Sequence, residues 1–193
     1  MRIGLNALYI IPGGVGGTEI YLRELVRELD GLGTEHEFIV FTNRETGPIG
    51  THPAVLPVNG AFRPGRLLYE QFALPRALRR ERIDILLNPG FTAPGWPGIP
   101  QVTVFHDLQY KRHPEYFRRL DLPAWEFFMW LAVKRSTAMI TSSEATRQVL
   151  SDTAARAHAL LDEQYQLLNQ EVMPALAAHG IEIIHHARRT PAQ

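Results

Sequence analysis

The sequence predicts an α/β domain with a Rossmann-like, doubly wound and mainly parallel sheet, and three observations carry this prediction. Strand patterns alternate with helix patterns over residues 1–150. The first strand runs through a glycine-rich turn into an amphipathic helix. Polar residues follow the end of a later strand, where open sheets of this kind bind their ligands. Residues 151–193 are expected to form a helical tail appended to this domain.

The first fifty residues contain one complete strand–helix–strand unit. Residues 3–11 are almost continuously apolar, which is typical of a strand buried on both faces. Residues 13–17 then break the strand, and from Thr18 the apolar positions recur with a helical period at Tyr21, Leu22, Leu25, Val26 and Leu29. Residues 36–42 read as a second strand. This unit predicts a parallel sheet with right-handed crossovers.

The rest of the domain continues the alternation. In order, the patterns predict a short strand at 55–58, a helix at 67–80 kinked near Pro75, strands at 83–87 and 101–105, a helix at 121–135, a strand at 138–141 and a capping box at 141–144 that opens a helix. Residues 91–100 are half proline and glycine and should be irregular. Residues 181–184 are a further candidate strand.

Composition excludes several classes of protein. With 45% hydrophobic and 21% charged residues, the chain has the profile of a soluble globular protein. Its 20 basic and 20 acidic residues cancel, so nucleic acid is not an expected partner. The absence of cysteine excludes disulfides and fits a cytoplasmic protein. The longest apolar stretch, residues 125–133, is too short to span a bilayer.

The glycine-rich turn is the first candidate for chemistry. A strand, a glycine turn and a helix N-terminus together bind phosphate, because free backbone N–H groups and the helix dipole point at one place. The turn is no dinucleotide fingerprint, since the third residue after Gly16 is Glu19, and no P-loop, since it contains no lysine. This spacing argues against a nicotinamide-dependent oxidoreductase. The alternative is that the glycines serve only the tight geometry of the turn.

His106 and Asp107 are the second candidate, because they follow the end of the strand predicted at 101–105. That edge of the sheet is where the glycine turn also lies, so both should face one crevice. A neutral imidazole there could hydrogen-bond a sugar hydroxyl or a carbonyl group. The alternative is a structural histidine. No third ligand is identifiable, so a metal site is not expected.

A basic and aromatic stretch, residues 110–119, follows this edge and includes Lys111, Arg112, Arg118 and Arg119. It could meet a phosphorylated or lipid-borne acceptor, which would bring the protein to the inner face of the membrane as a peripheral protein. An ordinary solvated helix face explains the same pattern, and we favour that interpretation.

Three motifs in the order GGVGGTEIYLRELVREL, VTVFHDLQY and ITSSEATRQVL resemble the N-terminal domain of family 4 retaining glycosyltransferases. The resemblance covers residues 1–150. It implies transfer of a hexose from a nucleotide-sugar co-substrate to a sugar or lipid-linked acceptor in carbohydrate biosynthesis, without a bound cofactor. It places Gly16, Gly17 and Thr18 against the donor phosphate and the acceptor, and His106 at the transferred sugar. Ser143 and Glu144 match a pair that we take to be structural.

The chain departs from this family after residue 150. Family members continue into a second domain with a basic pair and two glutamates that grip the donor, and the remaining residues are too few for a domain of about 150. Glu163 and Glu171 have the spacing of those glutamates, which we interpret as coincidence because the accompanying strand and loop are missing. The sequence therefore predicts half of an active site, weakly active or inactive alone.

The tail resembles another family. The segment LLDEQYQLLNQEVMPALAAHGIEII is similar to part of the N-terminal helical domain of polyphosphate kinases, but none of that enzyme's catalytic histidines can be mapped onto it. An apolar stripe along the tail needs a partner surface. The alternative to an enzyme half is therefore a non-catalytic truncated or fused remnant, whose tail helix packs on the sheet or forms a homodimer.

Overall fold

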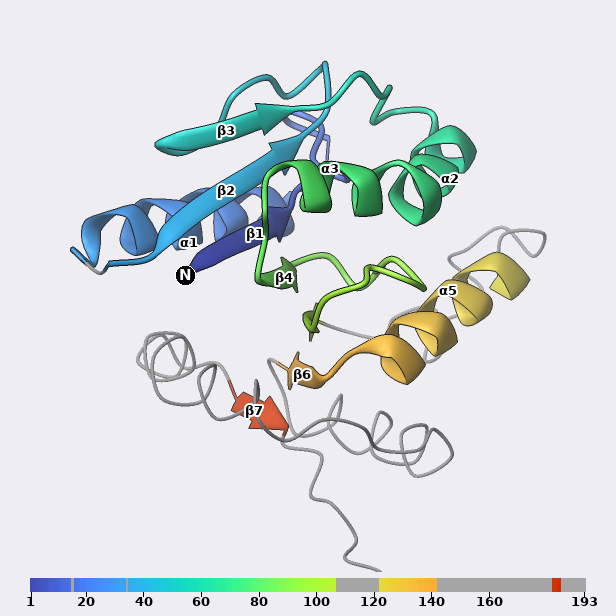
Figure 1. Ribbon diagram of the computed structural model, residues 1–193. Coiled ribbons are helices and arrows are strands. Elements are labelled where there is room, and N and C mark those ends of the chain that lie inside the picture. The colour runs from blue at the N-terminus through green and yellow to red at the C-terminus, as the bar shows by residue number, and fades with distance from the viewer. Residues whose placement is uncertain (15, 34, 107–121, 142–181, 185–193) are drawn as a thin grey trace, which may run out of the picture.

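A computed structural model describes residues 1–14, 16–33, 35–106 and 122–141, together with the backbone of residues 182–184. Its centre is one seven-stranded sheet in the order β3-β2-β1-β4-β5-β6-β7 (Figure 1). The strands are β1 (Arg2–Asn6), β2 (Glu37–Thr42), β3 (His52–Val55), β4 (Ile85–Asn88), β5 (Gln101–Phe105), β6 (Ala138–Thr141) and β7 (Glu182–Ile184). The first six are parallel, and β7 pairs antiparallel with β6. This confirms the predicted Rossmann-like sheet.

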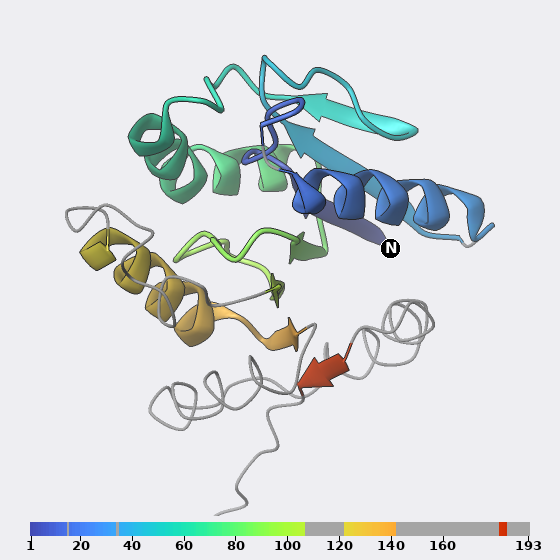
Figure 2. The same ribbon diagram turned by 180° about the vertical axis from the view of Figure 1, so that it is seen from behind.

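One face of the sheet is covered by helix α1 (Gly17–Gly31), which stands in front of the strands in Figure 2. Its apolar stripe buries Leu22, Val26 and Leu29. These side chains pack on alternate strand residues such as Ile3, Leu5 and Val40, which are almost inaccessible to solvent. The predicted helix face is therefore the one that builds the core.

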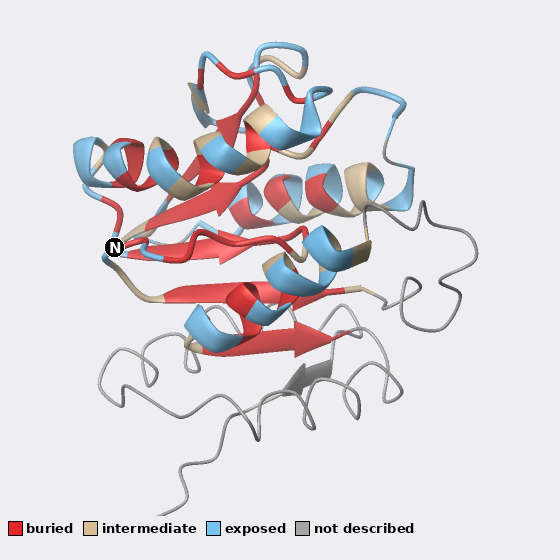
Figure 3. Cartoon of the chain, turned by 90° about the vertical axis from the view of Figure 1, so that its right-hand side faces the viewer, coloured by how far each residue is buried: buried red, intermediate tan, exposed pale blue. Residues whose placement is uncertain are grey.

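The opposite face carries α2 (Arg63–Phe72), α3 (Leu74–Arg80) and α5 (Leu122–Arg135) (Figure 1). Helix α3 packs Leu74, Ala77 and Leu78 on the β1–β2 side of the sheet, while α5 packs Met129, Ala132 and Val133 on the β5–β6 side. Strands coloured as buried lie between helices whose outer sides are exposed (Figure 3). The helices on both faces explain why the strands are apolar throughout.

Three predicted boundaries were wrong by more than two residues. Strand β1 ends at Asn6, because the chain turns at residues 8–9 although Leu8 and Ile10 remain fully buried. The third strand is β3 at His52–Val55, not 55–58; it lies at the sheet edge, where Pro53 has no pairing amide to lose. The kinked helix is two helices that meet at Ala73, with α2 starting four residues earlier than predicted, at Arg63.

Strand β7 brings a segment from beyond residue 150 into the sheet. Its register pairs Ile183 with Ile140 and Ile184 with Met139. The predicted strand at 181–184 is thus confirmed, whereas the predicted tail helix lies outside the described residues. In the described part of the chain no helix is long and apolar enough to cross a bilayer.

The strand order reverses between β1 and β4, which makes this the switch point of the sheet. The chain leaves β1 toward α1 on one face and leaves β4 toward the loop at 89–100 on the other. Asn6 and Asn88 end these two strands side by side, and Asn6 donates a hydrogen bond from Nδ2 to Asn88 Oδ1 (3.0 Å). Ligands of open α/β sheets bind at such a point, which makes it the candidate functional site.

Candidate functional site

The glycine turn lies at the switch point, between β1 and α1. Gly16 has φ 58° and ψ −130°, a backbone conformation that side chains disfavour, and it is the residue that leads into the helix. Space for a Cβ is not the constraint, because an added Cβ at Gly16 or Gly17 would meet nothing within 4 Å. The turn thus leaves backbone atoms of both glycines exposed beside the N-terminus of α1.

Glu19 holds the turn from inside the helix. Its Oε2 accepts a hydrogen bond from the Gly13 amide (2.8 Å), while its Oε1 contacts Arg23 one helical turn later (2.9 Å). The Gly13 bond, and after it the Arg23 bond, lowers the pKa of the Glu19 carboxyl below its ordinary value. Glu19 therefore stays ionised and clamps the turn near neutral pH.

Asn43, which directly follows β2, anchors the other end of the turn. Its Nδ2 donates to the carbonyl oxygens of Leu8 (2.9 Å) and Ile10 (2.6 Å). Thr46 adds a second bond to the Ile10 carbonyl, from Oγ1 (2.7 Å). Sequence reasoning missed Asn43, although its position just past a parallel strand is the same signal that singled out His106.

His106 directly follows β5, and its side chain reaches α1. Its ring meets Tyr21 edge-on, with centroids 4.7 Å apart and an angle of 77° between the planes. On the β4 side, the His106 Nε2 lies 2.9 Å from the carbonyl oxygen of Pro89. Because a carbonyl only accepts, Nε2 carries a proton in this contact. The imidazole is thus fixed between α1 and the β4 loop, and its contact on α1, Tyr21, comes one helical turn after Thr18.

A buried polar network lies beneath the loop at 89–100. Asn88 donates from Nδ2 toward Gln101 Oε1 (3.2 Å), the Val102 carbonyl (3.3 Å) and Thr103 Oγ1 (3.4 Å). Gln101 in turn donates to the carbonyl of Pro94 (2.8 Å). The network joins the carboxyl end of β4 to β5 and fixes the loop that carries Pro89.

A second polar group beside the turn was not predicted: Tyr9, Tyr21, Arg66 and Glu70. Arg66 is 6% and Glu70 1% exposed, yet Arg66 Nε, Glu70 Oε1 and both tyrosine hydroxyls have no hydrogen-bond partner among the described residues. Burial raises the pKa of Tyr21 to about 12 and raises the pKa of Tyr9 further. The sequence did not indicate that Arg66 and Glu70 are buried, because an arginine and a glutamate four residues apart usually lie on the solvent-exposed face of a helix.

Burial also shifts the pKa values of Glu70 and Arg66 in this group. It raises the pKa of Glu70 above its ordinary value, and the opposing effects of Arg66 and of the Thr92 hydroxyl bond (3.0 Å) are smaller. Burial lowers the pKa of Arg66, against the attraction of Glu70. The Tyr9 ring closes the group on the β4 side, because a Cβ at Gly90 would lie 2.7 Å from its Cε1 atom.

The predicted site residues fall into two sets. Gly16, Gly17 and Thr18 open α1, and His106 packs on that helix through Tyr21, so they lie at one edge of the sheet as expected. Their contact with substrate stays a prediction. Asp107, Ser143, Glu144, the basic stretch at 110–119 and the glutamates at 163 and 171 lie outside the described residues. Within the described ranges no group of three metal-binding side chains occurs.

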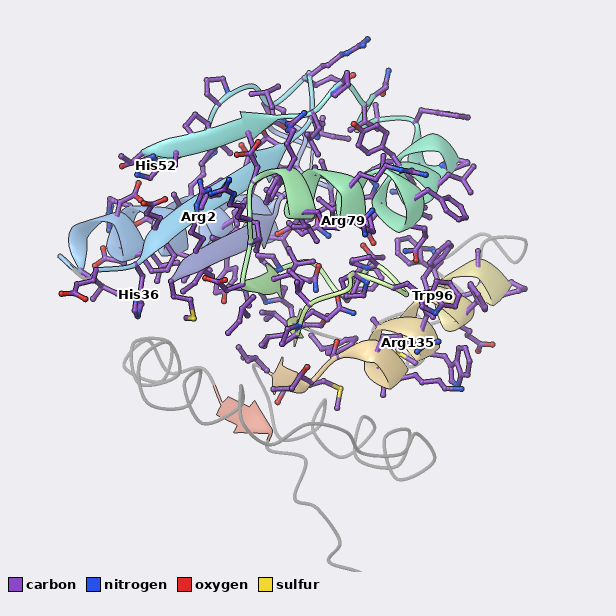
Figure 4. All side chains as sticks on the ribbon, viewed as in Figure 1. Arg2, His36, His52, Arg79, Trp96 and Arg135 are labelled. Atoms are coloured by element: carbon purple, nitrogen blue, oxygen red, sulfur yellow. The ribbon has the colours of Figure 1, made fainter. Side chains whose placement is uncertain are left out.

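A small cavity of about 110 Å³ lies elsewhere, at the amino edge of the sheet, and Asp30, His36 and His52 are among its lining residues. Both histidines are labelled far from Trp96 and Arg135 in Figure 4. The Asp30 carboxylate accepts a hydrogen bond from the Thr51 amide (2.9 Å) and so fixes the loop before β3. We interpret this cavity as structural.

The fold is thus a Rossmann-like domain, and a glycine turn and a histidine lie at the switch point, at the carboxyl edge of its parallel strands. Residues 15–159 match the family described as Glycosyltransferase Family 4, and the chain belongs to that family. The match confirms the resemblance seen in the three motifs. It does not test the boundary at residue 150 or the similarity of the tail to polyphosphate kinase.

Comparison with solved structures supports the fold alone. The UDP-GlcNAc 2-epimerase from Methanocaldococcus jannaschii superimposes with a TM-score of 0.53 at 14% sequence identity. The match covers 79% of this chain and 42% of that one, so the chain spans less than half of the epimerase's length. No curated protein matches the sequence.

Proposed function

We propose that the chain is the acceptor-side half of a retaining glycosyltransferase that uses a nucleotide-sugar donor. The observation that carries the proposal is the position of His106 in a family 4 chain, fixed against α1 by Tyr21 and by the Pro89 carbonyl. Gly16 and Gly17 are exposed where α1 begins, and together with Thr18 they would bind the donor diphosphate at the helix N-terminus. His106 would contact the transferred sugar, and Asp107, the next residue in the sequence, is proposed as a further substrate contact; the acceptor would lie on this half.

Retaining transfer passes through an oxocarbenium-like state while a nucleoside diphosphate departs, and cationic groups must stabilise that departing charge. The resemblance to the family implies that these groups belong to the second domain. We therefore propose that these 193 residues alone transfer sugar weakly or not at all. Robust transfer from a radiolabelled nucleotide sugar by the purified chain would contradict this part of the proposal.

Binding can be tested separately from turnover. Titrating a nitrogen-15-labelled chain with uridine, guanosine and adenosine diphosphate sugars should shift the amide signals of Gly16 and Gly17 together with the His106 imidazole. His106→Ala should keep the response to the diphosphate and lose the part that depends on the sugar. Leu32→Ser, at an exposed position near the other end of α1, serves as the matched control. Shifts confined to other regions would exclude the proposed site.

A second candidate function is non-catalytic, and the pairing of β7 with β6 favours it. A tail that adds a strand to the sheet could serve to close the domain edge or to join two copies. We keep as proposals that the tail is a polyphosphate kinase-like helical segment and that its stripe forms a homodimer. Light scattering tests the dimer, because a strict monomer at all concentrations would exclude it.

A further inference from the structure

The surface formed by α2, the loop at 91–100 and α5 is unusually apolar. Nine large hydrophobic residues of the described chain are well exposed, and six of them lie in these three segments or, in the case of Phe62, directly before α2: Phe62, Leu68, Phe72, Trp96, Phe127 and Trp130. Trp96 is 65% and Phe72 63% exposed. Single exposed apolar side chains are common on protein surfaces, but a group of six indicates an interaction surface.

Direct contacts make these segments one continuous surface, here called the α2–α5 surface. The Arg63 guanidinium of α2 lies 5.8 Å from the Trp125 ring of α5. Gln71 of α2 bonds the loop at both the Ala93 carbonyl and the Gly95 amide. The loop's Trp96 lies beneath Arg135 of α5, at 5.0 Å from ring centroid to guanidinium. Figure 4 shows Trp96 and Arg135 together on the α5 side.

The same surface is basic. The exposed basic residues of its helices are Arg63, Lys134 and Arg135. The adjoining α3 adds Arg76, Arg79 and Arg80, of which Arg80 is paired with Glu81 (3.1 Å). Of the acidic residues on these helices, Glu126 is exposed and Glu70 is buried. Lys134 lies over the Trp130 ring at 4.7 Å, so cationic and aromatic groups alternate at short range. An otherwise neutral chain thus concentrates positive charge where it exposes aromatic rings.

We propose that the α2–α5 surface binds the headgroup region of a bilayer that contains anionic phospholipids. Tryptophan and phenylalanine insert at the boundary between headgroups and acyl chains, and long basic side chains reach back to the phosphates. Positive charge complements an anionic leaflet and opposes association with a second identical surface. This inference goes beyond the proposed transferase function and does not require sugar transfer.

The test is sedimentation of the purified full-length chain with vesicles. Binding is expected to vesicles of phosphatidylcholine mixed with phosphatidylglycerol, to fall with added salt, and to be much weaker with phosphatidylcholine alone. Two of the chain's three tryptophans lie on the surface as exposed residues, so their fluorescence should shift to the blue on binding. No sedimentation with anionic vesicles, or equal sedimentation with neutral ones, overturns the proposal.

Two pairs of variants locate the binding surface. Trp96→Ser with Trp130→Ser should abolish sedimentation, whereas Leu32→Ser with Val55→Ser, at exposed apolar positions elsewhere, should not. Arg63→Gln with Lys134→Gln should weaken binding roughly fivefold per residue, and Arg27→Gln with Arg44→Gln should not. Unchanged circular dichroism and melting show that each variant is folded. Equal losses in the control variants, or retained binding in both test variants, would overturn the assignment.

Duplex DNA is the alternative partner, because it is also anionic and could bind the same basic side chains. Duplex DNA would use the cations but not the apolar rings, so it should compete with vesicles only if the surface is a nucleic-acid site. No competition by duplex DNA is expected. Displacement of the protein from vesicles by DNA, with loss of DNA binding in Trp96→Ser with Trp130→Ser, would assign the surface to nucleic acid instead.

Discussion

The Tyr21 ring supports the His106 imidazole edge-on, with centroids 4.7 Å apart. Tyr21 belongs to α1 and His106 follows β5, so this contact joins the glycine-turn helix to the strand that carries the histidine. The pair therefore connects the two sequence motifs on which the proposed function depends.

The Tyr21 hydroxyl and ring should have separable effects. The hydroxyl is buried without a partner among the described residues, so Tyr21→Phe should change the free energy of unfolding by less than about 1 kcal/mol. It should also remove a phenol that titrates at about pH 12. Tyr21→Ala removes the ring and should cost about 2 kcal/mol or more. Urea unfolding measures both; a costly Tyr21→Phe would reveal a hidden partner of the hydroxyl.

The two glycines of the turn should respond oppositely to alanine. Gly16→Ala forces a side chain into φ 58° and should destabilise the fold by about 1–3 kcal/mol. Gly17→Ala, at the first residue of α1, should be neutral or stabilise by about 0.5 kcal/mol. Both Cβ atoms would have open space, so the difference isolates backbone conformation. Equal effects of the two changes would contradict the geometry of the turn.

Acid should release the clamp that Glu19 places on the turn. Its pKa is lowered in the folded protein, so its contribution is present above the ordinary carboxyl pKa of about 4.3 and is lost as pH falls through the lowered value. The protection of the Gly13 amide against hydrogen exchange, relative to the intrinsic rate at each pH, should fall in that range. Glu19→Gln should make the exchange fast already at neutral pH. A Gly13 amide that stays protected in Glu19→Gln would show that another group holds the turn.

Glu70 should have the opposite pH dependence. Its pKa is raised by burial, so the folded state holds the proton more tightly than the unfolded state. Stability should therefore fall as pH rises from about 4.3 to the raised pKa and stay constant above it. Glu70→Gln keeps an oxygen for the Thr92 hydroxyl and should remove this slope. Urea unfolding across pH tests it, and an unchanged slope would assign the titration to another group.

Local pattern predicted most of the fold. Strand β5 at Gln101–Phe105 and β6 at Ala138–Thr141 were predicted to the residue, because each is a short apolar run with clear breakers on both sides. The core face of α1 followed from its helical period. Strand β3 was misplaced because an edge strand that contains Pro53 has neither the apolar run nor the alternation of an inner strand.

The candidate site was predictable only in part. The rule that ligands bind past the carboxyl ends of parallel strands found His106 and the glycine turn. The same rule could have found Asn43, which donates hydrogen bonds to the carbonyl groups of Leu8 and Ile10, between β1 and the glycine turn. No rule of spacing could have found Arg66 and Glu70, because their burial depends on how α2 docks against Tyr9 and the β4 loop.

The sequence by itself determined the elements, their alternation and the family, since periodicity, turn residues and motif spacing are local properties of the chain. Tertiary structure alone decided that Tyr21 meets His106 and that the tail strand β7 closes the sheet beside β6. It also decided that Phe72, Trp96 and Trp130 are exposed while Arg66 and Glu70 are buried. The physical reason is that burial and contact between distant segments depend on how helices pack on the sheet, which no local pattern encodes.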